Sequence, residues 1–241
     1  MDDQFIRTRM LLGSEGLERL AHSHVAVFGL GGVGSWCAEA LCRSGIGELT
    51  LIDQDEVSVS NINRQAAALH STVGMKKAEA TALRLKDIAP ECLLHPVAER
   101  YEAENRDRFF DVKYDFIVDA IDLVSCKLDL IETAHKLGIP IISALGTGNK
   151  LDAQQLRIAD IAKTEGCPLA RIIRKELRAR GINHSQVVFS PELAHSAETG
   201  DEVPPPGRRS IPASSMWVPA TAGLLLAQAV ILQLSGCATG R

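Results

Sequence analysis

A glycine-rich segment in the first quarter of the chain has the residue types and the spacing that bind phosphate. The apolar run Val25–Phe28 is followed by four glycines: Gly29, Gly31, Gly32 and Gly34. Glycine lets the backbone turn tightly and approach a phosphate without a Cβ in the way. A helix is predicted from Ser35 to Arg43, and its N-terminus would offer unpaired N–H groups and a positive dipole end. A structural glycine turn is the alternative, because this pattern alone is a weak signal.

An acidic residue and a polar run follow the glycines at the distance that a nucleotide site requires. The strand-like run Leu49–Ile52 leads into Asp53, about 20 residues past the loop, where a carboxylate holds a ribose hydroxyl. The polar residues that come next are Asp55, Asn61, Arg64 and Gln65. A dehydrogenase needs the acid but has little use for these side chains. Asp55 also has a simpler interpretation, in which it only caps the loop after its strand.

A lysine and a second acid complete the set. Lys77 lies at the start of a predicted helix, and Asp122 follows the strand-like run Phe116–Val118. In an open α/β sheet the carboxyl ends of these strands converge on one crevice. Cations, amide side chains and acids around a phosphate loop suit charge development at phosphorus or a metal-bound triphosphate. They suit hydride transfer poorly.

Strand and helix patterns alternate along the part of the chain that must position these residues. The predicted strands are Val25–Phe28, Leu49–Ile52, Leu93–Ala98, Phe116–Val118 and Pro140–Ala144, and the predicted helices are Ser35–Arg43, Lys76–Ile88, Glu104–Phe109 and Ile131–Leu137. This alternation predicts an α/β fold, a Rossmann-like and mostly parallel sheet with helices on both faces. A C-terminal extension carries further strands at Gln155–Asp160 and Gln186–Ser190 and a helix at Pro168–Arg180.

The 241 residues suit a single domain, residues 1–241, with three parts. These are a helical segment (1–24, with one or two short helices from Phe5 to Leu20), a nucleotide-binding core (25–150), and a substrate-facing extension with a C-terminal helix (151–241). The net charge of −4 argues against binding nucleic acid over the whole surface, but allows a local basic patch. Residues 1–10 are polar and charged, unlike a signal peptide, so we expect a cytoplasmic protein. The proline-rich stretch Ala194–Arg209 predicts a mobile loop or crossing segment.

The cysteines and the last apolar segment test this interpretation. The six cysteines form no C-x-x-C pair, which fits a reducing cytoplasm, argues against a disulfide framework or a Cys₄ zinc site, and predicts no zinc. Met216–Leu234 is nearly as long as a membrane span, but Pro219 near its start and two glutamines favour a buried helix. Peripheral membrane contact of this helix is the alternative.

Taken together, the motifs resemble those of the ubiquitin-activating and sulfur-carrier-adenylating superfamily, whose members attach AMP to a carboxylate. As they stand here, the motifs are G-x-G-G-x-G, D-x-D-x-V-x-x-S-N-x-x-R-Q, V-G-x-x-K and D-x-x-D. The resemblance implies that ATP and Mg²⁺ bind, with the glycine loop and Asp55 next to the nucleotide. It assigns Asp53 to the ribose hydroxyls, and Asn61 and Arg64 to the triphosphate with Gln65 in support. It assigns Lys77 to the α-phosphate and Asp122 to the metal. Arg9 matches an arginine that reaches across a homodimer into the partner's site.

The second half of the chain is similar to the tRNA threonylcarbamoyladenosine dehydratase branch of that superfamily. The residues that carry this resemblance are Asp160-Ile-Ala-Lys-Thr164, Pro168-Leu-Ala-Arg171 and the basic helix after them. Cys167 stands where an acid is expected. The branch implies ATP-dependent adenylation and cyclisation of a carboxylate on tRNA, with release of AMP and pyrophosphate. It also implies a link to a cysteine desulfurase or sulfur-acceptor system and leaves room for a monovalent cation.

The helix that begins at Pro168 carries a basic stripe at helical spacing. Its members are Arg171, Arg174, Lys175 and Arg178. Leu169, Ile172, Ile173 and Leu177 are expected on the other side. A stripe of this kind is often only the solvated face of an amphipathic helix. Together with the resemblance, it predicts contact with several tRNA phosphates.

Three other functions stay open. An adenylyltransferase for a small sulfur-carrier protein would exchange pyrophosphate without tRNA, and the missing C-x-x-C pairs argue against it. A scaffold that only senses nucleotide would bind ATP without releasing pyrophosphate. An NAD-dependent oxidoreductase is the weakest alternative, because it leaves Asn61, Arg64 and Lys77 unexplained.

Overall fold

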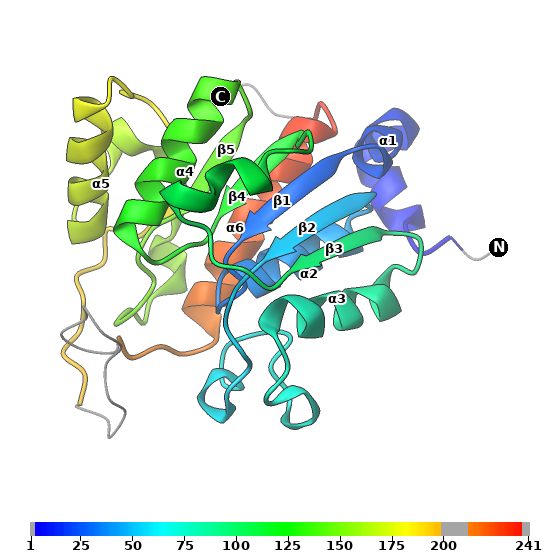
Figure 1. The fold of residues 1–241 in the computed structure, drawn as a ribbon, viewed down its shortest axis with the longest axis horizontal. Coiled ribbons are helices and arrows are strands. Elements are labelled where there is room, and N and C mark those ends of the chain that lie inside the picture. Colours follow the sequence, from blue (N-terminus) through cyan, green and yellow to red (C-terminus); the bar gives the residue numbers. More distant parts are fainter. Residues whose placement is uncertain (1–2, 199–211, 238–241) are drawn as a thin grey trace.

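A seven-stranded sheet forms the centre of the molecule (Figure 1). The structure is a computed structural model that describes residues 3–198 and 212–237. The strands are β1 His24–Phe28, β2 Glu48–Ile52, β3 Leu93–Val97, β4 Phe116–Asp119, β5 Ile141–Ala144, β6 Arg157–Asp160 and β7 Gln186–Phe189. Their order across the sheet is β3-β2-β1-β4-β5-β7-β6, and only the β6–β7 pair is antiparallel.

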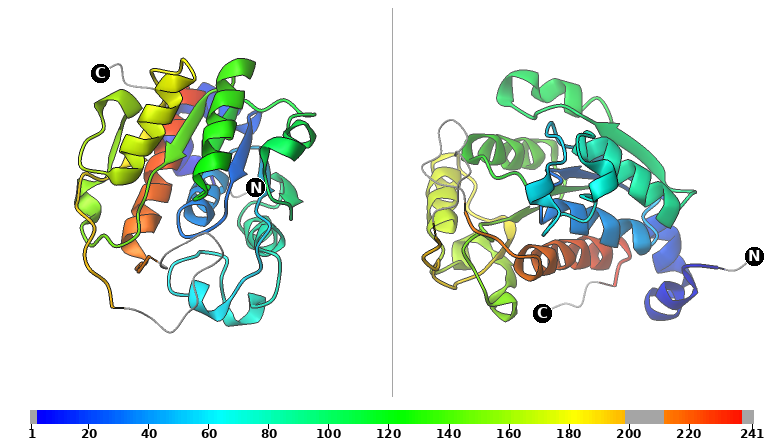
Figure 2. Two further views of the ribbon diagram at one scale, coloured as in Figure 1. Left: turned by 60° about the vertical axis from the view of Figure 1, so that its left-hand side comes forward. Right: turned by 90° about the horizontal axis from the view of Figure 1, so that it is seen from below.

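Helices cover both faces of this sheet, as Figure 2 shows from two further sides. They are α1 Ile6–Ala21, α2 Gly34–Arg43, α3 Lys77–Ile88, α4 Val124–Leu137, α5 Pro168–Ala179 and α6 Trp217–Leu234. One apolar core joins α2, α3 and α6 to inward-facing residues such as Val25 and Leu49. A second joins α4, α5 and the 3-10 segment Ala103–Phe109 to the opposite face, around Phe28. The predicted α/β fold with a mostly parallel sheet is confirmed.

The strand order also fixes where a ligand site belongs. β2 and β4 lie on either side of β1. The chain therefore builds β2 and β3 towards one edge of the sheet and then crosses back past β1 to build β4 and β5 towards the other. Ligands bind such sheets at the carboxyl ends of the strands next to this switch point. In this molecule that position is the glycine loop after β1, with the ends of β2 and β4 beside it. The extension contributes β7 and β6 to the same sheet, and the three-part division of the chain stays a prediction.

Two predicted helices need correction, whereas the third predicted strand is confirmed. The helix predicted at Ile131–Leu137 begins earlier, at Val124, because the weak helix formers Val124 and Ser125 give its first turn little helical signal. The helix predicted at Glu104–Phe109 is a 3-10 segment. The third strand forms despite Pro96, because β3 is an edge strand, where a missing N–H donor is tolerated. From residue 199 to its end, the predicted loop Ala194–Arg209 lies outside the described residues.

α6 packs as a partly buried helix. Val218, Leu226 and Val230 are buried against α2 and the sheet, whereas Trp217 and Leu224 are about half exposed. This helix has the length and hydropathy of a membrane span, and 44% of that stretch is buried inside the fold. A core helix of a soluble protein passes the same test, so membrane contact stays a prediction.

Candidate active site

The glycine loop is shaped by close backbone contacts. Gly29 has φ +89°, and a Cβ there would lie 2.7 Å from the Ala120 carbonyl oxygen. A Cβ on Gly34 would lie 1.8 Å from the carbonyl oxygen of Gly29. A Cβ on Gly31, in contrast, would meet nothing within 4 Å. Gly29 and Gly34 therefore let the turn form, and Gly31 leaves open space over the loop, where a phosphate can approach.

Asp53 holds the loop to the end of β2. One carboxylate oxygen accepts the Leu30 N–H at 2.7 Å, and the other accepts the Asp55 N–H at 2.9 Å. Burial raises the pKa of the Asp53 carboxyl, although nearby Lys77 and these two hydrogen bonds act in the opposite direction. A carboxylate has about four acceptor positions, so Asp53 keeps capacity for the ribose hydroxyls that the resemblance assigns to it.

Lys77 lies beside this loop and forms an ion pair with the Asp55 carboxylate. Its ammonium contacts Asp55 Oδ2 at 2.8 Å, and the Lys77 side chain is only 10% exposed, against 55% for Asp55. The Lys77 N–H also donates to the Asp55 carbonyl at 2.9 Å. Asp55 therefore positions the Lys77 side chain, a role beyond capping the loop after β2. An incoming phosphate can replace this exposed carboxylate as the partner of the ammonium.

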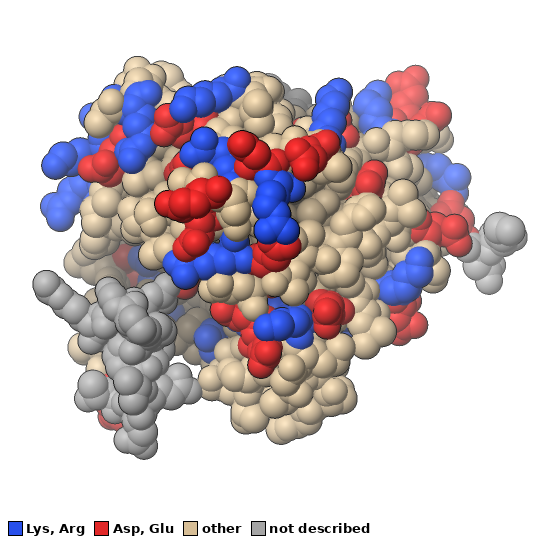
Figure 3. All heavy atoms as spheres, in the orientation of Figure 1, with Lys and Arg blue, Asp and Glu red and all other residues tan. Residues whose placement is uncertain are grey.

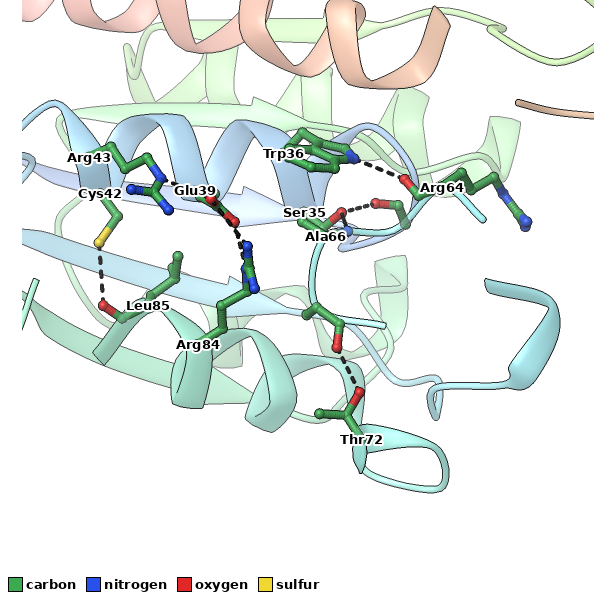
Figure 4. A network of polar contacts seen from close by, with 12 residues as sticks. Ser35, Trp36, Glu39, Cys42, Arg43, Arg64, Ala66, Thr72, Arg84 and Leu85 are labelled. Carbon is green, nitrogen blue, oxygen red and sulfur yellow. Dashed lines mark hydrogen bonds and ion pairs between the residues drawn. The ribbon is translucent and has the colours of Figure 1, made fainter. Parts of the chain in front are cut away.

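Arg64 is fixed to α2 through its backbone, while its side chain points away from that helix (Figure 4). The Trp36 indole donates to the Arg64 carbonyl at 2.9 Å. Ser35 donates to the Gly31 carbonyl at 2.7 Å and accepts the Ala66 N–H at 3.0 Å. A Cβ on Gly32 would lie 3.4 Å from Arg64 Cγ, so the arginine stem runs next to the glycine loop. The guanidinium donates to the Ser60 carbonyl and the Asn63 side chain, both at 2.8 Å.

The two amide side chains predicted at the site, those of Asn61 and Gln65, are more buried than Arg64. Asn61 and Gln65 are both buried, and Asn61 Oδ1 accepts the Ser58 N–H at 3.2 Å, closing a cap on the short turn that leads to Arg64. Asn61 therefore supports the turn with its oxygen. Its amide N–H₂ group is the part left for a ligand.

A buried carboxylate joins the helices that begin at the site. Glu39 of α2 accepts Arg43 at 2.8 Å and Arg84 of α3 at 2.6 Å (Figure 4). Burial acts to raise the pKa of Glu39, but the two arginines outweigh it, so the pKa lies below the ordinary value. This network ties α2, which follows the glycine loop, to α3, which begins at Lys77.

A buried ion pair that the sequence analysis missed spans the turn after β4 and joins the last residue of β4 to α4. Asp119 is 0% exposed and accepts the Lys127 ammonium at 2.6 Å, and its other oxygen accepts the Ile121 N–H at 3.0 Å. The predicted metal ligand Asp122 is exposed on the same turn, at the carboxyl edge of the sheet. Asp119 thus shapes the turn that presents Asp122. The sequence offered one signal of this ion pair: Lys127 stands among the apolar positions on the buried side of α4.

The predicted tRNA-binding stripe divides into two kinds of residue. Arg171, Lys175 and Arg178 are exposed on α5 and have no side-chain partner within residues 3–198 and 212–237. Figure 3 shows Lys and Arg side chains gathered over this end of the molecule, with acidic groups among them. Arg174 is half-buried and donates to the Thr164 carbonyl at 2.7 Å and hydroxyl at 2.6 Å. Ile172, expected on the apolar side, is 47% exposed, so the buried side of α5 is narrower than predicted.

Arg9 lies apart from the other predicted site residues. It is exposed on α1 and forms an ion pair with Asp3. Figure 1 shows α1 beyond the amino ends of the strands, across the sheet from the glycine loop. Arg9 therefore does not join the site of its own chain, and its contribution to a partner's site stays a prediction.

The cysteines offer little for catalysis. Within the described residues, five are buried and Cys237 is half-buried. Burial raises the pKa of the Cys37 and Cys126 thiols, which disfavours the reactive thiolate. Cys167 caps α5 by accepting the Ala170 N–H at 3.5 Å. A thiol-based mechanism finds no support in this geometry.

Comparison with known proteins gives consistent results. The model of the ThiF family matches residues 5–240. A tRNA threonylcarbamoyladenosine dehydratase from Bacillus subtilis is 41% identical over 96% of this chain and 94% of its own length. The Escherichia coli tRNA N6-threonylcarbamoyladenosine dehydratase in complex with ATP superposes with a TM-score of 0.87 at 35% identity, covering 98% of this chain and 95% of that one. The same enzyme in complex with AMP gives a TM-score of 0.85, with the same identity and coverage.

Proposed function

The chain belongs to the ThiF family, and we propose that it is the ATP-dependent dehydratase of N6-threonylcarbamoyladenosine in tRNA. The observation that carries the proposal is the meeting of Asp53, Arg64 and Lys77 around one glycine loop at the carboxyl edge of the sheet. The similarity to the Bacillus and Escherichia dehydratases, which extends over nearly the whole chain, supports the substrate class. Family membership also argues against the oxidoreductase alternative.

In the first step the protein activates a poor electrophile. The free carboxylate of the threonyl side chain attacks the α-phosphorus of ATP, pyrophosphate leaves, and an acyl-adenylate forms. Lys77 and Arg64 offset negative charge that develops on the phosphates, and the loop N–H groups hold them in place. Asp53 holds the ribose. Asp55 keeps the Lys77 ammonium beside the loop until a phosphate takes its place.

In the second step the substrate supplies its own nucleophile. A nucleophilic group in the same side chain attacks the activated carbonyl, loses its proton and expels AMP, which carries away the former carboxylate oxygen. The net result is a ring and the loss of one water from the nucleoside. Closure within one side chain benefits from a high effective concentration, so an enzyme thiolate is not required. The buried cysteines are in keeping with that.

Magnesium fits the acids at this edge. Mg²⁺ uses one or two carboxylates together with substrate phosphates, and Asp122 is an exposed carboxylate at the end of β4. The resemblance assigns to Asp122 the position that would hold the metal, while Asp119 beside it pairs with Lys127. Bound Mg²⁺ supplies positive charge against the triphosphate. No residue set among the described positions is assigned to a monovalent cation, which stays a prediction.

Two exposed surfaces support the proposed partners, tRNA and a second copy of the chain. Arg171, Lys175 and Arg178 supply a basic face on α5 for tRNA phosphates. A homodimer would bring Arg9 to a second site, and the exposed Met10 and Leu11 beside it (81% and 83%) are apolar surface that a partner subunit would cover. A cysteine desulfurase or sulfur-acceptor partner, and a cytoplasmic location, stay predictions from the resemblance.

One assay separates the proposal from its alternatives. Incubation of threonylcarbamoyladenosine-containing tRNA with ATP and the protein should give AMP, pyrophosphate and a nucleoside lighter by one water, as measured by mass spectrometry. Asp122→Ala should abolish AMP release and keep the unfolding midpoint, whereas the exposed control Asp111→Ala should keep both. Pyrophosphate exchange that depends on a sulfur-carrier protein and not on tRNA would favour the adenylyltransferase. ATP binding without any pyrophosphate release would favour the scaffold.

A further inference from the structure

Three metal-ligating side chains meet where the first residues of β1 and β2 lie beside the middle of β3, towards the edge of the sheet opposite the nucleotide loop. One ligand atom from each of His24, Glu48 and His95 lies within 4.8 Å of the other two. Glu48 Oε1 is 2.8 Å from His95 Nε2 and 3.6 Å from His24 Nδ1. The reaction proposed above uses none of these residues.

The strand register puts these side chains on one face. His24 pairs with Glu48, and Thr50, two residues further along β2, pairs with His95. Cross-strand partners share a face, as do residues two apart. Because β3 is the edge strand, His95 is half exposed, whereas the His24 side chain is only 12% exposed. The cluster is therefore anchored on its inner side and open to solvent on its outer side.

A second hydrogen bond orients the inner histidine. Thr50 Oγ1 lies 2.8 Å from His24 Nε2, so Nδ1 is the ring atom that faces Glu48. Tyr114 packs edge-on against the His24 ring, with centroids 4.9 Å apart. Histidines that bind metals almost always donate their other ring N–H to an oxygen, which fixes the tautomer. Thr50 supplies such an oxygen here.

We propose that His24, Glu48 and His95 form a binding site for a divalent cation of the zinc class, with one coordination position open to water. Imidazole nitrogen and carboxylate oxygen are the ligands that Zn²⁺ takes at about 2.0–2.2 Å. Tetrahedral bonds of that length separate ligand atoms by about 3.3 Å. The measured 2.8 and 3.6 Å lie on either side of this value, so small side-chain rotations are sufficient.

The site differs from the one that the cysteine pattern excludes. The absence of C-x-x-C pairs argues against a Cys₄ zinc site, and the prediction of no zinc depended on that pattern. His24, Glu48 and His95 are far apart in sequence and follow no spacing rule, so only the parallel register brings them together. A metal here would join the edge strand β3 to β2 and β1.

Metal titration of the full chain tests this proposal without reference to catalysis. After removal of bound metal with EDTA, calorimetry with ZnCl₂ should give one equivalent bound, and Zn²⁺ should raise the unfolding midpoint. Co²⁺ should give d–d absorption without thiolate charge-transfer bands, which distinguishes these ligands from the six cysteines. Loss of an outer-shell partner lowers metal affinity about 10–100-fold, so Thr50→Val should weaken Zn²⁺ binding by about tenfold or more. His95→Ala and Glu48→Gln should weaken it further.

A matched control is available in the segment before β7, next to the end of β6. His184 also faces a carboxylate, with its Nδ1 3.0 Å from Asp160, but no second histidine joins this pair among the described residues. His184→Ala should therefore leave Zn²⁺ affinity unchanged. His95 is half exposed, so the metal-free His95→Ala variant should unfold at the wild-type midpoint. Equal Zn²⁺ affinity in the wild type and His95→Ala would overturn the proposal, as would a wild type that takes up no stoichiometric Zn²⁺.

Discussion

The nucleotide edge of the sheet and the outer face of α5 are both rich in charge, but they hold their charges differently. At the nucleotide edge the charged groups contact one another: Lys77 contacts Asp55, Asp119 contacts Lys127, and Asp53 is bound to the loop. On α5, Arg171, Lys175 and Arg178 project into solvent without partners in the described part of the chain. The difference suits the two tasks. Stabilising charge during a reaction requires fixed groups, whereas meeting a polyanion requires exposed ones.

This contrast predicts different consequences of mutation in the two regions. Changes at the nucleotide edge should alter stability or the rate of the chemical step. Changes on α5 should alter tRNA affinity and its dependence on salt.

The largest effect is expected from the buried ion pair between the end of β4 and α4. Asp119→Asn leaves the Lys127 ammonium buried without its counter-charge, which should lower the free energy of unfolding by about 3–5 kcal/mol. The double variant Asp119→Asn/Lys127→Met should lose less, because it removes both charges. Urea unfolding at pH 7 measures both variants. Lys136→Met, which breaks an exposed pair with Glu132 on the same helix, is the control and should cost about 0.5 kcal/mol or less. A loss no larger than that control in Asp119→Asn would mean that the turn is not held by this pair.

Next in size is the effect of removing the cation beside the loop. Lys77→Ala should lower kcat for AMP release about 10²–10³-fold, the cost of losing one fixed charge or donor at a reacting centre. The neighbouring Lys76 is the matched control, because it is more exposed and pairs with Glu56 at 3.0 Å. Lys76→Ala should leave kcat within about twofold, since surface pairs contribute little. Equal kcat in the two variants would remove Lys77 from the chemistry.

The fold was largely predictable because buried parallel strands leave a clear pattern. Val25–Phe28 is apolar throughout and Leu49–Ile52 is apolar except for Thr50, and turn residues separate these runs from helices. The predictions failed where local sequence and burial disagree. The first turn of α4 was missed because Val124 and Ser125 are weak helix formers, while the packing of that helix on β4 and β5 overrides their preference.

The predicted site residues differ in how much of their position the sequence could give. The glycines follow β1 directly and Asp53 follows β2 directly, so the predicted pairing of two successive parallel strands is enough to bring them together. The Asp119–Lys127 pair depends on which face of α4 turns inward, and the His24–Glu48–His95 cluster depends on the register of three strands. Neither the inward face nor the register can be read from residue types alone. The same is true of Arg174. Helical spacing places it in the basic stripe, but its guanidinium donates hydrogen bonds to Thr164, a contact that the spacing does not predict.

A smaller effect is expected when the exposed charges of α5 are reversed. Arg171→Glu/Arg178→Glu should weaken tRNA binding by about tenfold and flatten the slope of log K against log salt, because fewer counterions are released. ATP binding should be unchanged. Arg108→Glu, an exposed arginine paired with Glu99, is the control for a general change in charge. Binding and slope that match the control would return the stripe to a solvated helix face.

The finest test compares two arginines of one helix. Arg174 donates to the Thr164 carbonyl and hydroxyl, so Arg174→Gln should lower the free energy of unfolding by about 1 kcal/mol. Its effect on the salt dependence of tRNA binding should be small, because the guanidinium is already engaged within the chain. Arg178→Gln should do the reverse: it should reduce the salt slope by about 1 and leave stability within about 0.5 kcal/mol. Salt slopes and urea unfolding of both variants give the two readouts. If Arg174→Gln reduces the slope as much as Arg178→Gln does, the stripe has four members rather than three, and binding must release Arg174 from Thr164.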